Sequence, residues 1–342
     1  MDGESVRALA YPALVGSPRV GDRVLLNTTA LDRELGTGGY AFVVALPDRL
    51  PPDPPRTATT TSPQAGHIVK SRYTPLQAMV ASVDEQGSPY HELLREAGSV
   101  EGMPVVVADL HSALPAILAG LFASFRTAAG VSVRVCYVMQ DGGALPAWFS
   151  RTVAGLRAAG WLAATVTTGQ SFGGDLEAVT VHTGLLAARH VAGADVAVVT
   201  QGPGNLGTGT RWGFSGVAAG EAVNAVAALG GRPVASLRLS DADQRPRHRG
   251  VSHHSLTAYG QVALAVCDVV VPVLPEPLAS RVAADVAPLA KRHRLVTVPV
   301  DGLDAALRES PVPLSTMGRG LDSDLAYFLA AAAAGRHAAG LL

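Results

Sequence analysis

Three histidines lie within seven residues of the chain, in the segment RHRGVSHHS at residues 247–255. A neutral imidazole can bind a divalent metal or act as a general base, and an arginine can bind an anion through paired hydrogen bonds. The segment can therefore be a metal site, an anion-binding site or a charged loop without chemistry. The residues that accompany it, and the elements that position it, decide between these interpretations.

The same segment contains the start of a predicted helix over residues 253–266. Ser252 is a suitable N-cap, so His253 and His254 fall in the first turn, where the helix dipole favours the neutral imidazole. Neighbouring helix positions point about 100° apart, so we do not expect these two histidines to bind one metal ion together. We expect one of them to face a site while the other packs.

Asp109 and His111 form a second candidate pair, at the end of an apolar run. In an extended chain their side chains point the same way and can bind a divalent metal or act as an acid–base pair. The alternative is that Asp109 or Ser112 caps the following helix. We predict four catalytic residues: Asp109, His111, His253 and His254. We predict three candidate metal ligands: Asp109, His111 and His248.

The sequence GPGNLGTGT at residues 202–210 follows a predicted strand and contains the spacing G-x-G-x-x-G. Pro203 lacks an amide donor, and the next helix starts late, near Phe214, so a nicotinamide cofactor is only an alternative. A loop that donates amides and hydroxyls to a phosphate or carboxylate fits better, and a turn needed only for close backbone packing is also open. The predicted ligand-binding residues are Gly202, Gly204, Gly207, Thr208, Thr210 and Arg247.

Two further loops carry charged residues. Arg238, Arg245, Arg247 and Arg249 accompany Asp241 and Asp243, which makes a bidentate anion site plausible. In FGGDLEAVT, at residues 172–180, we predict that Asp175 and Glu177 lie in the first turn of a helix, where the helix dipole favours acids.

From residue 102 onward, strand-sized apolar runs alternate with helix-sized segments. Continuous Val/Ala/Leu runs are typical of strands buried on both faces, so we predict a parallel sheet with helices on both sides. Ligands bind such sheets beyond the carboxyl ends of the strands, where all the candidate residues fall. The seven predicted strands are MPVVVADL, VSVRVCYVM, WLAATVTT, ADVAVVTQ, RPVASLRLS, CDVVVPVL and HRLVTVPV. The predicted helices cover residues 113–128, 145–159, 176–190, 217–229, 253–266 and 277–293.

The first part of the chain differs from the rest. Short Val/Leu/Thr runs separated by Gly, Pro and Asp predict small antiparallel strands, so we expect a β-barrel-like domain over residues 1–98 with a proline-rich loop at 47–66. Residues 99–342 are then a Rossmann-like, doubly wound α/β domain.

The composition indicates which kinds of binding partner to expect. Apolar residues make up 48% of the 342 residues and charged residues 16%, which favours a homo-oligomer, most simply a dimer. The net charge of −1 does not favour nucleic acid or membrane as a partner. Cys136 and Cys267 lie in apolar runs, which predicts buried free thiols in a reducing compartment. The chain lacks a signal-peptide pattern and a clean apolar span, so we expect a cytoplasmic location.

Four motifs, RYTPLQ at 72–77, FGGDLEAVT at 172–180, GPGNLGTGT at 202–210 and RHRGVSHHSLTA at 247–258, resemble a bacterial family defined only as a domain of unknown function. The resemblance covers nearly the whole chain. It implies a cytosolic bacterial protein and supplies no activity, substrate or catalytic residue.

We therefore expect an enzyme, a hydrolase or group transferase, that binds a small anionic molecule of phosphorylated or nucleotide-like type. A divalent metal is a candidate cofactor. One alternative is a non-catalytic ligand-binding or scaffold homo-oligomer, and another is a nicotinamide-dependent oxidoreductase.

Overall fold

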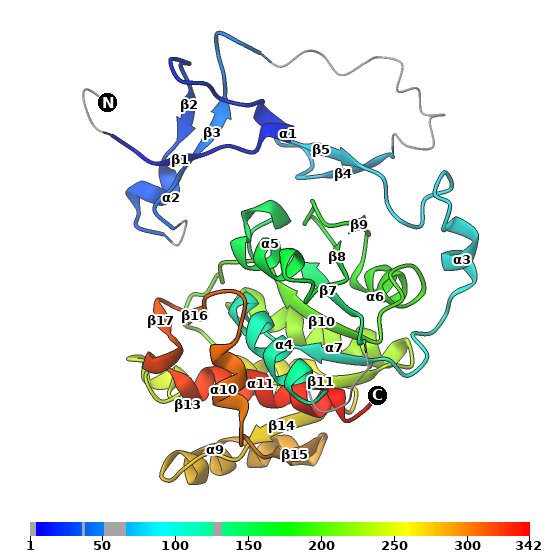
Figure 1. Cartoon of the computed structure of the whole chain (residues 1–342), viewed down its shortest axis with the longest axis vertical. Coiled ribbons are helices and arrows are strands. Elements are labelled where there is room, and N and C mark those ends of the chain that lie inside the picture. Colours follow the sequence, from blue (N-terminus) through cyan, green and yellow to red (C-terminus); the bar gives the residue numbers. More distant parts are fainter. Residues whose placement is uncertain (1–4, 36–37, 51–65, 126–131) are drawn as a thin grey trace. The chain divides into compact units, whose positions relative to one another are not determined.

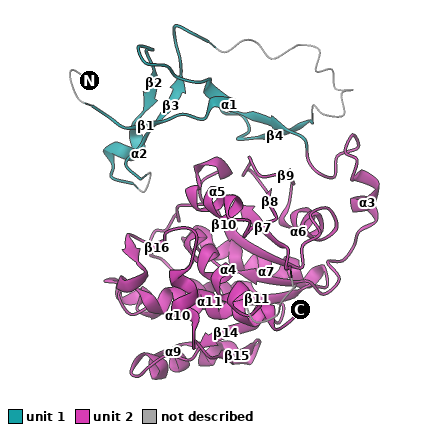
Figure 2. Cartoon of the chain, in the orientation of Figure 1, with its two compact units in different colours: residues 1–81 teal, residues 82–342 magenta. Residues whose placement is uncertain are grey.

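The computed structural model describes residues 5–35, 38–50, 66–125 and 132–342. The chain divides into two compact units, Met1–Ala81 and Ser82–Leu342 (Figure 2). We predicted the boundary at 98/99, and the structure instead groups residues 82–98, with helix α3 (His91–Glu96), with the larger unit. The predicted proline-rich loop falls largely on residues 51–65, outside the described ranges.

The first unit is β-rich, as predicted, but a barrel is not confirmed in its described residues. Strand β3 (Ala41–Ala45) pairs in parallel with β1 (Ala8–Leu9) and antiparallel with β2 (Leu25–Asn27). A separate two-stranded sheet consists of β4 (Ile68–Lys70) and β5 (Ala78–Val80). These two open sheets, with short helices α1 (Pro12–Val15) and α2 (Thr29–Asp32), enclose only a small apolar cluster, which consists of Val15, Val43 and Leu46.

The second unit is built on an eight-stranded parallel sheet with the order β15-β14-β11-β6-β10-β7-β8-β9. All seven predicted strands are present, so the parallel α/β prediction is confirmed. The strands are β6 (Pro104–Val107), β7 (Val135–Gln140), β8 (Ala164–Thr167), β9 (Leu176–Glu177), β10 (Val196–Gln201), β11 (Arg232–Ser236), β14 (Asp268–Pro272) and β15 (Arg294–Val298). Every residue of β6 and β10 is buried, which explains their continuous apolar sequences.

Helices cover both faces of the sheet (Figure 1). One face is covered by α4 (Leu114–Ala123), α10 (Leu303–Arg308) and α11 (Leu325–Ala339), and the other by α6 (Val181–His190) and α7 (Ala218–Ala228). The remaining helices are α5 (Arg151–Ala158), α8 (His253–Thr257), which continues as a π-helical turn at Ala258–Val262, and α9 (Leu278–Val286). Of the helices in the described residues, none has the length and apolarity to cross a membrane.

Helices α4 and α11 cross at a pair of glycines. A Cβ atom on Gly120 would lie 1.9 Å from the carbonyl oxygen of Ala332, and one on Gly335 would lie 1.8 Å from that of Ile117. Neither position therefore tolerates a side chain. This close approach lets the alanine-rich helix α11 bury itself against α4 and the sheet.

The prediction that Asp175 and Glu177 begin a helix is wrong. Leu176–Glu177 forms strand β9 beside β8, and α6 begins only at Val181. The Asp175 carboxylate accepts hydrogen bonds from the amide and hydroxyl of Thr165, and Glu177 accepts one from the Thr167 hydroxyl. These bonds hold the segment to the sheet, and Thr180 provides the helix N-cap instead.

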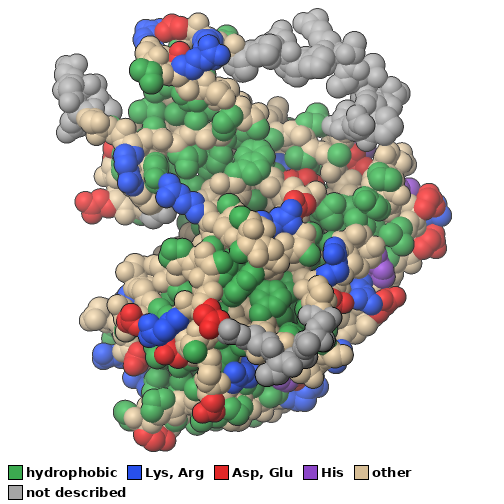
Figure 3. All heavy atoms as spheres, in the orientation of Figure 1, with side chains coloured by type: hydrophobic (Ala, Val, Ile, Leu, Met, Phe, Trp, Pro, Cys, Tyr) green, Lys and Arg blue, Asp and Glu red, His purple; other side chains and the backbone are tan. Residues whose placement is uncertain are grey.

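The two cysteines are free and buried, as predicted. Burial raises the pKa of both Cys136 and Cys267 to about 12. On the face of the molecule seen in Figure 3, charged side chains of both signs are scattered among apolar ones.

Candidate functional site

The carboxyl ends of β6, β10 and β11 bring three loops together. Gln201, the last residue of β10, donates hydrogen bonds from Nε2 to the Asp109 carbonyl at 2.7 Å and to Asn205 Oδ1 at 3.0 Å. Gln201 thus links the loop after β6 to the glycine loop. Arg238, two residues after the end of β11, lies beside Asp109. The loops converge because β6 lies between β10 and β11 in the sheet.

Asp109, Arg238 and His254 form a buried polar group at this edge. Asp109 Oδ2 lies 3.4 Å from His254 Nδ1 and 3.6 Å from Arg238 NH1, and Asp109 and Arg238 are 4% and 5% exposed. Burial raises the pKa of Asp109, but its interaction with His254 and the charge of Arg238 outweigh burial, so the pKa is lowered. Asp109 is therefore a carboxylate at neutral pH.

Three imidazoles converge next to this group. His248 comes from the 3₁₀ turn Pro246–His248, and His253 and His254 come from α8. One ring nitrogen from each of the three lies within 4.8 Å of the other two. We did not expect His253 and His254 to bind one metal ion together, and ring positions alone do not test that expectation. Their ring nitrogens nevertheless lie close together, because imidazoles extend well beyond Cβ and can rotate toward each other.

Local structure fixes the three rings. Ser252 caps α8, as predicted, by accepting a hydrogen bond from the His254 amide at 3.2 Å. The same hydroxyl lies 2.7 Å from His248 Nδ1. The Phe214 ring stacks on His254, with ring centroids 3.8 Å apart and planes 4° apart. The helix cap, the turn before it and the loop after β10 all contribute to the cluster.

His248 and His253 are neutral at pH 7. Burial, followed by the charges of Arg238 and Arg245, lowers the pKa of His248 to about 3. Burial, followed by the charges of His254 and Arg247, lowers the pKa of His253 to about 4. The sequence predicted neutral imidazoles from the helix dipole, whereas burial is the main cause in the structure. Neutral imidazole is the form that accepts a proton or binds a metal.

His111 lies in a different environment. Its Nδ1 is 2.9 Å from the Tyr137 hydroxyl, and its Nε2 is 2.7 Å from Ser150 Oγ, so both ring nitrogens have partners. Burial lowers its pKa to about 4. The predicted pairing of Asp109 with His111 required an extended chain, but a 3₁₀ turn begins at His111, and the two side chains face different partners. Nothing in this geometry brings His111 to the histidine cluster.

The glycine loop is largely bonded to itself. Thr208 and Thr210 share a hydrogen bond between their hydroxyls, and both also bond the backbone of Gly213. A Cβ atom on Gly202 would lie 2.4 Å from the Ala144 carbonyl oxygen, so this glycine is required for backbone packing. Gly204 has a φ of +88°. Of the predicted binding residues, Gly207 and Arg247 line a pocket.

Two pockets adjoin the histidine cluster. The smaller, of about 80 Å³, is lined by Asn205, Gly207, Gly209, Arg238, Arg245, Arg247, His248, His254 and Met317. The larger, of about 600 Å³, is lined by Gly209, Arg211, Arg247, His253, Leu256, Thr257, Gly260, Gln261, Asp285, Pro288, Leu289, Lys291, Arg292 and His293. His253 lines the larger pocket, and His248 and His254 line the smaller one, so the cluster borders both. Gly209 and Arg247 line both pockets.

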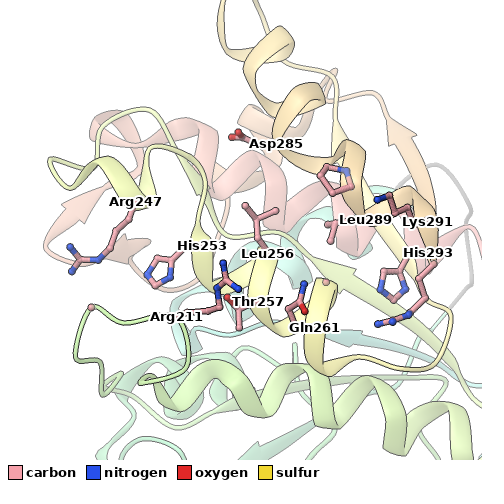
Figure 4. Close-up of a pocket in the computed structure, with 14 residues that line it drawn as sticks. Arg211, Arg247, His253, Leu256, Thr257, Gln261, Asp285, Leu289, Lys291 and His293 are labelled. Carbon is pink, nitrogen blue, oxygen red and sulfur yellow. The ribbon is translucent and has the colours of Figure 1, made fainter.

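Arginine, lysine and histidine side chains line the larger pocket along its length. Arg211, Arg247 and His253 gather at one end, and Lys291 and His293 lie at the other (Figure 4). Arg211 and Lys291 were not among the site residues predicted from the sequence. The position of Arg211, directly after the glycine loop, was an available signal, whereas Lys291 follows α9 and reaches the pocket only through the tertiary fold.

Arg245 is less available for a ligand than the other arginines. It forms a bidentate pair with the buried Asp243, with contacts of 2.9 and 2.8 Å. Arg319 also contacts Asp243, at 3.3 Å, and pairs with the buried Asp324 at 2.9 Å. These pairs anchor the hairpin of β16 (Ser315–Thr316) and β17 (Arg319–Gly320), whose turn places Met317 at the smaller pocket.

Comparisons with known proteins agree with the resemblance found from the motifs. Searches of curated proteins and of solved structures found no match. A family model matches residues 7–335, which is nearly the whole chain and includes the glycine loop and the histidine cluster. The chain therefore belongs to the family described as protein of unknown function, DUF3866.

Proposed function

We propose that the chain is an enzyme that binds a small phosphorylated or nucleotide-like anion at the carboxyl edge of the sheet and hydrolyses or transfers a group there. The observation that carries the proposal is the position of His253 in the wall of a basic pocket of about 600 Å³. Pockets for small ligands typically have volumes of about 300–1,000 Å³.

Charge explains why the ligand should be an anion. Four side-chain cations line the larger pocket, namely Arg211, Arg247, Lys291 and Arg292. Asp285 is the acidic side chain among the described lining residues, and its Oδ2 accepts a hydrogen bond from the Val251 amide. Guanidinium groups bind phosphate oxygens through paired hydrogen bonds, and lysine adds a point charge. The excess of positive charge therefore favours a ligand with more than one negative charge.

The histidine cluster gives a reason to propose catalysis as well as binding. Neutral imidazoles at the pocket wall can accept a proton from an attacking hydroxyl or bind a metal that polarises the substrate. In a phosphoryl transfer, the oxygen of water or of an acceptor forms the new bond to phosphorus while the bond to the leaving oxygen breaks. The proton of the attacking oxygen then passes, through the site or solvent, to the leaving group.

A thermal-shift screen tests the binding step. We expect nucleotides or other phosphorylated metabolites to raise the melting temperature of the chain, and by more as their concentration rises further above the dissociation constant. Arg247→Gln should weaken binding of the best compound about tenfold or more, because a charge-assisted hydrogen bond contributes about 1.5–3 kcal/mol. Arg308→Gln is a matched control, because Arg308 does not line either pocket described above. Arg308 is half-exposed and pairs with Asp304 on α10 and with Asp322 in the turn Leu321–Ser323.

An activity assay with the compounds that bind tests the second step. We expect turnover by the wild-type chain and its loss in His253→Ala and His254→Ala variants that keep their fold. Binding without turnover would support the non-catalytic alternative. If no anion in the screen stabilises the chain, the proposal is wrong. NAD and NADP belong in the same screen, because stabilisation by them alone would favour an oxidoreductase.

A further inference from the structure

We propose that His248, His253 and His254 bind one divalent transition-metal ion through their Nε2 atoms, and that Asp109 holds His254 in the ligating tautomer. The assignment deepens the proposed function, and it rests on that function only for the role that the metal would have. The three proposed ligands do not have the sequence spacing of the metal-binding motifs that place two ligands on one helix face, since two of them are adjacent in the chain.

The hydrogen bonds of the three rings determine which nitrogen is available. Ser252 Oγ occupies His248 Nδ1, and Arg238 and Asp109 face His254 Nδ1. These contacts leave Nε2 of both rings for a ligand. A ligating imidazole in proteins commonly bonds a hydroxyl, carbonyl or carboxylate through its other nitrogen, as His248 does with Ser252.

Two buried polar atoms at this place have no hydrogen-bond partner among the described residues: His253 Nε2 and Asp109 Oδ2. An unmatched buried polar group is unfavourable, so each of the two atoms calls for an explanation. A metal bound by His253 Nε2 would supply the first partner. The same metal on His254 Nε2 would require the proton of that ring to be on Nδ1, where it can be donated to Asp109 Oδ2. One ion therefore accounts for both atoms.

The contact between Arg238 and His254 depends on which ring nitrogen of His254 carries the proton. Its NH1 lies 3.0 Å from His254 Nδ1, and because a guanidinium can only donate, this contact requires an Nδ1 without a proton. When Nε2 binds a metal, the Nδ1 proton replaces that contact, and Arg238 keeps Asp109, which is 3.6 Å away. The change is tautomeric, because the ring proton moves from Nε2 to Nδ1 of the same imidazole.

The distances are compatible with coordination after a small adjustment. One ring nitrogen of each histidine lies within 4.8 Å of one ring nitrogen of each of the other two. Three imidazole nitrogens on zinc, each at about 2.0–2.1 Å, lie about 3.3 Å apart. The rings must therefore close by about 1.5 Å or less, which rotation about the side-chain torsions of His248 and His253 can supply.

Three imidazole ligands suit zinc, copper, nickel or iron, and three protein ligands leave a coordination position open. Here the open position adjoins the arginine-lined pockets, because His253 lines the larger pocket and His248 and His254 line the smaller one. A metal at this position would polarise an oxygen of the bound anion. The nearby arginines disfavour a bare cation, so a bound anion should strengthen metal binding, and the metal should strengthen anion binding equally.

The test uses the full-length chain after treatment with a chelator, titrated with Zn²⁺ by calorimetry and with Co²⁺ by visible absorption. We expect one equivalent of either metal to bind, with Co²⁺ bands typical of four or five ligands. His248→Gln and His253→Gln should each weaken Zn²⁺ binding at least 100-fold. His182→Gln, an exposed histidine of α6, is the matched control and should bind as the wild type does.

Asp109→Asn tests the positioning role separately. We expect this variant to bind one equivalent of metal about 10–100-fold more weakly, with a changed Co²⁺ spectrum, because it lacks the carboxylate acceptor for the His254 proton. Circular dichroism checks that each variant is folded.

Absence of stoichiometric metal binding in the folded wild-type chain would overturn the inference. So would equal affinities in the His253→Gln and His182→Gln variants. These outcomes are distinct from failure of the proposed function: a chelator-treated chain that binds phosphorylated compounds but no metal would refute only the metal site. A chain that binds metal but no anion would refute only the proposed function.

Discussion

The carboxylate of Asp109 lies 3.4 Å from the imidazole of His254, although the two residues belong to different loops of the sheet. Asp109 follows β6, and His254 is in the first turn of α8. The Tyr259 hydroxyl, from the π-helical turn after α8, lies 2.8 Å from the Val107 carbonyl oxygen and 3.1 Å from that of Ser236. Tyr259 therefore ties α8 to the ends of β6 and β11, and this attachment brings His254 to Asp109.

Loss of the Asp109 carboxylate should destabilise the chain. In Asp109→Asn, the buried guanidinium of Arg238 loses its charge partner, and breaking a buried pair in this way costs about 3–5 kcal/mol. Urea unfolding followed by circular dichroism measures the loss. Asp322→Asn is the control, because Asp322 is 79% exposed and should contribute little. Equal stabilities of the two variants would contradict the buried pair.

Acid should destabilise the chain through His111. Its pKa is about 4 in the folded chain against 6.5 for an unperturbed histidine, so between these values only the unfolded chain binds the proton. The free energy of unfolding should therefore fall as the pH drops from about 6.5 to 4, by roughly 3 kcal/mol from this residue. Urea unfolding at pH 7.5, 5.5 and 4.5 should show a smaller loss in His111→Gln than in the wild type. The same loss in both would show that His111 is not the cause.

A side chain at Gly120 should disrupt the crossing of α4 and α11. The added Cβ atom of Gly120→Ala would lie 1.9 Å from the Ala332 carbonyl oxygen, which forces the helices apart. Overpacking of this kind costs about 1–3 kcal/mol or more. Gly340→Ala, at the end of α11, is the control, because its Cβ would have no neighbour closer than 3.4 Å. Thermal unfolding should show a large decrease for the first variant and little change for the second.

The two thiols should be inert in the folded chain. Burial and a pKa of about 12 keep Cys136 and Cys267 protonated and inaccessible. Ellman's reagent at pH 8 should therefore modify neither thiol before unfolding and both in 6 M guanidinium chloride, roughly the concentration that unfolds most domains. Rapid reaction of the native chain would show that β7, which contains Cys136, or the segment that contains Cys267 just before β14 opens readily.

The sequence by itself determined the architecture of the larger unit. Strands buried on both faces require continuous apolar residues, and this local signal identified all seven long strands, β6 and β10 among them. The Ser252 cap was also readable, because an N-cap depends only on a side chain and the amides that follow it. The rule that ligands bind beyond the carboxyl ends of parallel strands directed attention to loops that the structure brings together at one edge of the sheet.

Only the tertiary structure decided how those loops meet. The position of β6 between β10 and β11 brings Asp109 to Arg238, and a strand order cannot be read from the strands themselves. His111 turns away into a bonded environment because the chain bends at that residue. The three imidazoles of His248, His253 and His254 converge because packing sets their rotamers, whereas sequence spacing sets only the direction in which each side chain leaves the backbone.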